Sequence, residues 1–387
     1  MDSKPNIVFV VSRFPYPLEK GDKLRAYYQI KELCQNYNIH LIALSDKRVP
    51  ESSIQELKKY CVSVEIHKLS KLSILFNSFL ALLGNKPIQV GYFYNYLIHL
   101  KIAKTLESLK PDYIFTQLTR TTEYTKDYHA CRKTLDYMDA FSKGMERRIK
   151  DAKWYNRWFF KLEYRRLLAY ERAMFDYYEQ KTIISEQDKK YIFHPDKTKI
   201  ICAPNGIDTT FFESQQIEKK YDFAFVGNMS YPPNIEAVTY IVKRILPHFS
   251  ESKLLIAGAN PHPKIEKMAK QNPQIVVSGW MDDIREAYSS SHIFLAPMKT
   301  GTGMQNKLLE AMAQGIPCVT TSLANNAIQA IDNESIFVCD SEEQLIPLLR
   351  KLLDDSNLRN TVGQKGKHFV EQHYSWQSAC QNLIDIH

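Results

Sequence analysis

The chain has few cysteines, and their arrangement offers no framework for a metal site or for disulfides. There are seven in 387 residues, scattered with no Cys-x-x-Cys pair, so neither a zinc site nor a set of paired disulfides is indicated. Their odd number, and an N-terminus that enters a strand pattern at Asn6 to Val11 rather than a signal peptide, lead us to expect a cytoplasmic protein.

Long hydrophobic runs are absent as well. The most apolar long segment, Leu72 to Leu83, is too short and too polar to span a bilayer.

The net charge of the chain is positive, at +8, which suits acidic partners such as nucleic acid, anionic lipid or a nucleotide diphosphate. The basic residues form no nucleic-acid-binding motif that we recognise, so we expect no nucleic acid partner.

The length and the strand pattern indicate two domains. A chain of 387 residues is long for one hydrophobic core. Both halves repeat a strand followed by a helix, which predicts two doubly wound α/β domains. A polar stretch rich in Gln and Lys, Glu213 to Lys220, is the expected linker. We therefore place the first domain at residues 1–212 and the second at residues 213–375.

The segment from Leu295 to Val319 is the most informative part of the sequence. An apolar strand pattern is followed by the turn Thr300-Gly301-Thr302-Gly303 and by a helical pattern from Met304 to Gln314. Glycine beside a helix N-terminus lets a phosphate approach backbone N–H groups. Lys307 and Glu310 are three residues apart and share one helix face, where they could hold a phosphate and a ribose hydroxyl. The alternative is an ordinary strand–turn–helix unit with a surface ion pair.

This segment resembles the nucleotide-sugar signature of retaining glycosyltransferases of family 4, which have the GT-B fold. The resemblance is carried by Leu309-Glu310-Ala311-Met312-Ala313 and by Gly315-x-Pro317. It implies that Glu310 binds the ribose and that Lys307, as a catalytic residue, stabilises the diphosphate. Thr302 stands where the family pattern has its first Glu. A closer similarity is to sugar transferases of bacterial polysaccharide systems, in which backbone N–H groups corresponding to Gly303, Met304 and Gln305 would hold the sugar.

The resemblance also implies an architecture. Two Rossmann-like domains would face a cleft, the second binding the donor and the first the acceptor, and a last helix at 376–387 would cross back to the first domain.

Two further loops of the second half are candidate donor contacts. Gly227 and Asn228 follow a strand, and Asn228 could donate a hydrogen bond to the diphosphate, although no Arg or Lys stands there as in many family members. Gly279 leaves room for a planar base, and Trp280 could stack on it or wall the pocket. The alternative for Trp280 is a core position, which is common for a large aromatic residue after a strand.

Candidate acceptor-side residues lie in the first half. A Pro-rich loop after the first strand ends at Gly21 and Asp22 and leads to Arg25, and ligands of open α/β sheets bind beyond strand ends. Asp22 could instead be a helix N-cap. Asp136 and Asp139 follow a later strand, and we assign Asp139 as a catalytic residue that orients an acceptor hydroxyl or takes its proton. The alternative is that Asp139 caps a helix.

A basic and aromatic stretch from Glu146 to Arg172 could lie on an anionic membrane surface, with Leu72 to Leu83 adding an apolar patch. The alternative is a packing helix with a solvated basic face. A protein that acts on a lipid-linked acceptor would gain from peripheral contact with the inner face of the cell membrane.

Taken with the resemblance, these features predict a retaining glycosyltransferase that moves a hexose-type sugar from a UDP- or GDP-linked donor. The acceptor would be a glycan or a lipid-linked molecule of cell-surface polysaccharide synthesis. We expect no cofactor and no metal, because the sequence has no D-x-D-type anchor that stands out and Lys307 can replace a cation. The alternatives are a catalytically inactive sugar-nucleotide-binding protein and a UDP-sugar epimerase.

Overall fold

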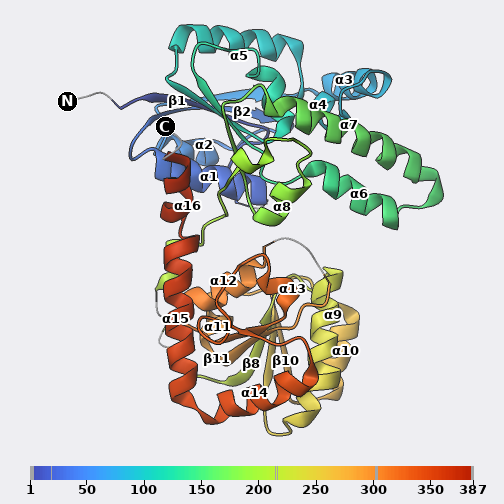
Figure 1. Cartoon of the computed structure of the whole chain (residues 1–387), viewed down its shortest axis with the longest axis vertical. Coiled ribbons are helices and arrows are strands. Elements are labelled where there is room, and N and C mark those ends of the chain that lie inside the picture. The colour runs from blue at the N-terminus through green and yellow to red at the C-terminus, as the bar shows by residue number, and fades with distance from the viewer. Residues whose placement is uncertain (1–3, 19, 214, 216, 301–303, 385–387) are drawn as a thin grey trace. The chain divides into compact units, whose positions relative to one another are not determined.

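The computed structural model describes residues 4–18, 20–213, 215, 217–300 and 304–384. The chain forms two compact units, one of residues 1–205 with residues from Ala379 onward and one of residues 206–378. Each contains one parallel sheet with helices packed on it (Figure 1). The prediction of two Rossmann-like α/β domains is confirmed. The units divide between Asn205 and Gly206, a few residues before the expected linker.

The sheet of the first unit has the strand order β3-β2-β1-β4-β5-β6-β7. Its strands form where short apolar runs can be buried on both faces, as parallel sheets require. The inner strand β1 has five buried residues in succession. The strands are β1 Asn6–Val11, β2 Asn38–Ser45, β3 Ser63–Lys68, β4 Tyr113–Gln117, β5 Arg132–Asp136, β6 Gln180–Ile183 and β7 Ile201–Cys202.

The helices of the first unit cover this sheet and extend beyond it. Helices α1 and α2 lie on one face and α5 on the other (Figure 1). A Cβ at Gly91 would lie 2.5 Å from that of Ala81, so glycine permits the close packing of α3 and α4. The helices are α1 Gly21–Leu33, α2 Glu51–Lys58, α3 Lys71–Leu83, α4 Ile88–Phe93, α5 Tyr96–Leu109, α6 Phe141–Asp151, α7 Arg157–Phe175 and α8 Glu186–Tyr191, with a 3-10 turn η1 at Thr119–Tyr124.

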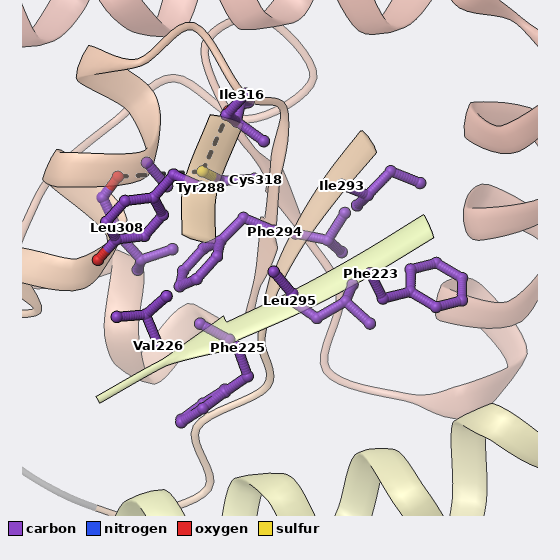
Figure 2. Close-up of a cluster of buried hydrophobic side chains, with 14 of the residues drawn as sticks. Phe223, Phe225, Val226, Tyr288, Ile293, Phe294, Leu295, Leu308, Ile316 and Cys318 are labelled. Carbon is purple, nitrogen blue, oxygen red and sulfur yellow. Dashed lines mark hydrogen bonds between the residues drawn. The ribbon is translucent and has the colours of Figure 1, made fainter. Parts of the chain in front are cut away.

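The sheet of the second unit has the strand order β10-β9-β8-β11-β12-β13. Figure 2 shows part of its core, in which Phe223 and Phe225 of β8 lie near Phe294 and Leu295 of β11. Leu308 of the following helix enters the same cluster, so the core fixes the position of that helix. The strands are β8 Tyr221–Val226, β9 Leu254–Ala257, β10 Ile275–Gly279, β11 Ser291–Ala296, β12 Cys318–Thr320 and β13 Phe337–Val338.

Helices α9 and α10 lie on one face of this sheet and α12 and α15 on the other (Figure 1). A Cβ at Gly363 would lie 2.1 Å from the carbonyl oxygen of Gly315, so α15 packs directly on the end of α12. The helices are α9 Pro232–Tyr240, α10 Pro263–Gln271, α11 Arg285–Ser289, α12 Asn306–Ala313, α13 Ser322–Asn325, α14 Glu342–Asp354, α15 Ser356–Tyr374 and α16 Trp376–Ile384.

The strand order of each sheet reverses at one point, between β1 and β4 in the first unit and between β8 and β11 in the second. Chain segments leave such a point in opposite directions and open a crevice beyond the carboxyl ends of the two strands. Ligands of open α/β sheets bind in this crevice. Each unit is therefore expected to bind a ligand at the reversal point of its sheet.

Candidate functional site

The reversal point of the second unit is flanked by the Gly227 loop after β8 and by the segment between β11 and α12. The Gly227 loop is packed tightly against its neighbour, because a Cβ at Gly258 would lie 2.0 Å from the carbonyl oxygen of Gly227. Gly258 also has a φ of +130°, which favours glycine. This packing holds the loop in one place beside the crevice.

Lys307, on the first turn of α12, is half-buried at this crevice. Its ammonium donates to Asn234 Oδ1 at 2.5 Å and lies 4.8 Å from the ring centroid of Phe225. Among the residues that the structure describes, it has no carboxylate within ion-pair distance. Burial lowers the pKa of Lys307 from 10.5 to about 8, and the charge of Glu310 offsets only part of that effect. The site therefore holds a desolvated cation that an anion would stabilise.

Glu310 lies one turn further along α12 and has a different partner. Its Oε2 accepts a hydrogen bond of 2.6 Å from the hydroxyl of Tyr288, which is fully buried. Burial raises the pKa of Glu310, against the opposing effects of Tyr288 and Lys307. The alternative of a surface ion pair between Lys307 and Glu310 is wrong, because neither side chain is exposed and each has its own partner.

Asn234 joins the lysine to the Gly227 loop, and sequence reasoning gave it no role. Its Nδ2 donates to the backbone oxygen of Asn228 at 2.9 Å, while its Oδ1 accepts from Lys307. A Cβ at Gly227 would lie 2.6 Å from that Nδ2, so the glycine makes room for the amide. The Pro-Pro-Asn start of α9 is the signal that could have pointed to this residue.

Asn228 remains a candidate donor contact. Its side-chain oxygen accepts hydrogen bonds from the N–H and the hydroxyl of Ser230, at 2.9 and 2.8 Å. These hydrogen bonds involve the side-chain oxygen of Asn228 and not its side-chain N–H groups. That Asn228 donates a hydrogen bond to a diphosphate stays a prediction.

Gly279 and Trp280 lie at the end of β10. Gly279 has a φ of +70°, a left-handed conformation that favours glycine, and a Cβ there would meet only Pro261 at 3.9 Å. Trp280 is 74% exposed. The core alternative for Trp280 is therefore wrong, and its exposed indole is accessible to a base for stacking.

The remaining predicted donor residues surround the start of α12. Thr302 and Gly303 lie outside the described residues. Met304 packs partly against the hydrophobic core, and Gln305 directly precedes the helix, which begins at Asn306 rather than at the predicted Met304.

In the first unit, the acceptor-side residues divide into two groups. Gly21 is exposed at the start of α1, and a Cβ there would make ordinary van der Waals contact with Cε of Met138 at 3.5 Å. Asp22 pairs with Arg13 at 2.6 Å and lies within α1, whose N-cap is Lys20. The N-cap alternative for Asp22 is therefore wrong.

Arg25 is buried, with an exposed fraction of 1%. Its Nε lies 2.6 Å from Asp136, which is fully buried, and its Nη1 donates to Asn205 at 2.9 Å. Arg25 thus connects α1 to β5 and to Asn205, the last residue of this unit before the chain enters the second. The predicted direct contact of Arg25 with an acceptor conflicts with this burial, and its role is structural.

Asp139 differs from Asp136, because its side chain keeps exposed surface. Desolvation by nearby protein and the charge of Asp188 raise the pKa of Asp139 to about 6. Helix α6 begins at Phe141 with Ala140 as its N-cap, so the alternative that Asp139 caps the helix is wrong. A carboxylate with this pKa can accept a proton near neutral pH.

Within the described ranges, no group of three or more His, Cys, Asp and Glu residues could hold a metal ion. In the same part of the chain, no helix is both long enough and apolar enough to cross a membrane.

Comparison with known proteins agrees with this geometry. Residues 220–355 match the family described as glycosyl transferases group 1. A Staphylococcus aureus capsular polysaccharide biosynthesis glycosyltransferase, CapM, is 24% identical over 48% of this chain, which spans about half (53%) of that relative. A 44.6 kDa protein in the cps region of Klebsiella pneumoniae is 23% identical over 87% of this chain and 88% of its own length.

Solved structures with the same fold include two of low sequence identity. TarM superposes with a TM-score of 0.67 at 10% identity, and Anabaena HepE in complex with UDP with a TM-score of 0.65 at 10% identity. Each comparison covers 98% of both chains. The chain therefore has the GT-B fold, and the match to the glycosyl transferases group 1 family covers residues 220–355 of its second unit. Its sequence relatives include proteins of capsular polysaccharide systems.

Proposed function

We propose that this protein is a retaining glycosyltransferase of family 4 type. It moves a hexose-type sugar from a UDP- or GDP-linked donor to a glycan or lipid-linked acceptor in cell-surface polysaccharide synthesis. The observation that carries the proposal is the desolvated ammonium of Lys307 at the reversal point of the second sheet, beside Glu310. The capsular relatives and the UDP complex of HepE support the substrate classes.

In the proposed reaction, the bond between the sugar and the nucleoside diphosphate of the donor breaks. When the sugar leaves, negative charge builds on the diphosphate, and a group that is already desolvated and in place stabilises that charge most strongly. Lys307 supplies a cation, and the backbone N–H groups at the start of α12 supply hydrogen-bond donors. Glu310 holds the ribose hydroxyls, since Tyr288 engages one of its oxygens at 2.6 Å and the other can accept from the sugar.

Asp139 serves the acceptor in this proposal. With a pKa of about 6, it is mostly ionised at neutral pH and can orient an acceptor hydroxyl or take its proton. Retention of the anomeric configuration is checked by NMR of the initial product, in which an inverted linkage would overturn that part of the proposal.

The proposed reaction needs neither a metal ion nor a cofactor, because Lys307 occupies the electrostatic role of a cation. Exhaustive chelation with EDTA should therefore leave the transfer rate unchanged. Loss of activity that manganese or magnesium restores would contradict this expectation.

The proposed membrane contact rests on side chains that the first unit exposes. Helix α3 exposes Leu72 at 82% and also Phe76 and Leu83, and Trp154 and Trp158 are exposed around the start of α7. The double variant Leu72→Ser/Phe76→Ser should reduce co-sedimentation with phosphatidylglycerol vesicles. Leu323→Ser, which removes an exposed apolar residue of the second unit, is the control. Equal sedimentation of all three proteins would refute the contact.

The experiment that tests the function has two stages. A thermal-shift screen across UDP, GDP, TDP and ADP sugars identifies the donor, because only a ligand of the folded state raises the melting temperature. Transfer to a membrane-derived acceptor mixture is then measured for the wild type, Lys307→Ala and Lys299→Ala. Lys299 is an exposed lysine of the same segment.

Loss of transfer in Lys307→Ala alone supports the proposal. Donor binding without transfer by the wild type would identify an inactive sugar-nucleotide-binding protein. Interconversion of two UDP sugars without acceptor would identify an epimerase.

A further inference from the structure

A cavity of about 420 Å³ lies within the first unit, beyond the carboxyl ends of β1 and β4. Arg13 follows β1 by two residues, and Arg120 follows β4 by three, within η1. Helices α4, α6 and α7 contribute the other walls. The cavity therefore occupies the reversal point of this sheet, the position where open α/β sheets bind ligands.

Three arginines line the cavity, and most of their charge lacks a partner. Arg13 pairs with Asp22. Arg120 donates to the neutral oxygen of Gln89 at 2.9 Å, and neither Arg120 nor Arg148 has an ion pair among the described residues. The one lining carboxylate, Glu163, accepts from the backbone N–H groups at the start of α4 at 2.8 and 3.0 Å. The cavity thus has an excess of positive charge.

Arg120 is held in position by aromatic rings. Its guanidinium carbon lies 4.5 Å from the ring centroid of Phe141 and 5.4 Å from that of Phe93. Desolvation and the nearby charge of Arg13 lower the pKa of Arg120 to about 10. The guanidinium of Arg120 stays charged at neutral pH. A bound anion would offset the electrostatic repulsion between Arg13 and Arg120.

Apolar side chains form another part of the lining. Phe93, Phe141, Met145, Phe159 and Phe160 contribute to the walls. A ligand that fits this surface has an oxyanion for the arginines and a hydrocarbon part for the rings. A neutral glycan would leave the arginine cations without a compensating negative charge.

We propose that this cavity binds the acceptor through a phosphate or diphosphate group joined to a hydrocarbon chain. The planar donors of arginine match the oxygens of a phosphate group and can bind two of them at once. The inference rests on the proposed function in one respect, because it takes the bound molecule to be the acceptor of the transfer. It adds Arg13, Arg120 and Arg148 as acceptor-binding residues.

The test uses farnesyl diphosphate as the probe, with inorganic pyrophosphate and farnesol as its two halves. All titrations use the full chain carrying Lys307→Ala, which weakens any binding of the probe's diphosphate at the donor site. Farnesyl diphosphate should bind more tightly than either half by calorimetry. Equal affinity for pyrophosphate would mean a site for free phosphate, and equal affinity for farnesol would mean an apolar site; either overturns the proposal.

Variants locate the binding. Arg120→Gln and Arg148→Gln should each weaken farnesyl diphosphate binding about tenfold, the usual effect of losing a hydrogen bond to a charged group. Arg132→Gln is the matched control, because it removes one exposed arginine at the amino end of β5. Arg148 is exposed, so its variant should fold even if the Arg120 variant does not. Unchanged affinity in Arg148→Gln and in a folded Arg120→Gln would refute the assignment.

The two proposals fail separately. Donor binding by the second unit is measured by thermal shift in the same arginine variants with Lys307 intact, and it should equal that of the wild type. If no sugar nucleotide binds while the probe does, the proposed function fails and the cavity assignment stands. If a donor binds and is transferred while the probe does not bind, the cavity assignment fails.

Discussion

Replacing Lys307 by Met should abolish activity and change the pH dependence of stability in a defined direction. Methionine has a similar length and no charge, so the variant removes the ammonium and its hydrogen bond to Asn234 while it still fills the space beside Phe225. If Lys307 stabilises the leaving diphosphate, turnover should fall about 100-fold or more, as when other preorganised transition-state donors are removed.

The magnitude of the stability effect follows from the pKa. Burial lowers the pKa of Lys307 from 10.5 to about 8. Between these values the unfolded chain binds more protons than the folded chain, so the contribution of Lys307 to the free energy of unfolding rises with pH. From pH 7 to pH 9.5, the wild type should gain about 2 kcal/mol relative to Lys307→Met. Packing differences between lysine and methionine that do not depend on pH cancel in this comparison.

The assay is urea denaturation of both proteins at several pH values between 7 and 9.5, without nucleotide. Lys299→Met is the control for the loss of one lysine from the exposed surface. A difference between wild type and Lys307→Met that does not change with pH would show that Lys307 is not desolvated. Normal turnover by the variant would remove Lys307 from the diphosphate site.

Three other predictions concern carboxylates and their partners. Glu310→Gln should weaken donor binding about tenfold, the usual effect of replacing a charged hydrogen-bond acceptor, and an unchanged calorimetric affinity would refute the ribose role. The kcat/KM of the wild type should fall as the pH drops through about 6, because protonation of Asp139 removes the base. Asp139→Asn should be slow at all pH values, and a variant that keeps the wild-type profile would exclude Asp139 as the base. Arg25→Met should lower the free energy of unfolding by about 3–5 kcal/mol, since it leaves Asp136 buried without its cation. Its donor affinity, measured at a temperature where it is folded, should equal that of the wild type, and a loss of affinity would mean that Arg25 also serves the donor site.

The parts of the fold that depend on local patterns could be predicted from the sequence. The apolar run that forms β11 and the helical pattern that forms α12 appear in one continuous segment, and the structure has both, with the helix within two residues of its expected bounds. Lys307 and Glu310 share a helix face because of their spacing alone. Their separate partners could not be predicted, because Asn234 is 73 residues from Lys307 and Tyr288 is on another helix.

The parts of the site that the sequence did not predict also depend on contacts between residues far apart in the chain. Arg25 looked like a ligand contact because its partner Asp136 is 111 residues away in the sequence. For Trp280, which was predicted as a donor contact, the core alternative fails because the side chain is 74% exposed after the left-handed residue Gly279. The arginine cavity of the first unit was not predicted at all, since Arg13, Arg120 and Arg148 come from three separate elements that only the sheet order brings together.

The central claim is that the diphosphate of a sugar nucleotide binds at Lys307. A crystal structure of the protein with the nucleotide diphosphate that the thermal-shift screen selects is its most direct test. We predict a phosphate oxygen within hydrogen-bond distance of Lys307 Nζ and the ribose hydroxyls at the carboxylate of Glu310. A nucleotide bound elsewhere, with the ammonium of Lys307 still held by Asn234 alone, would contradict the claim.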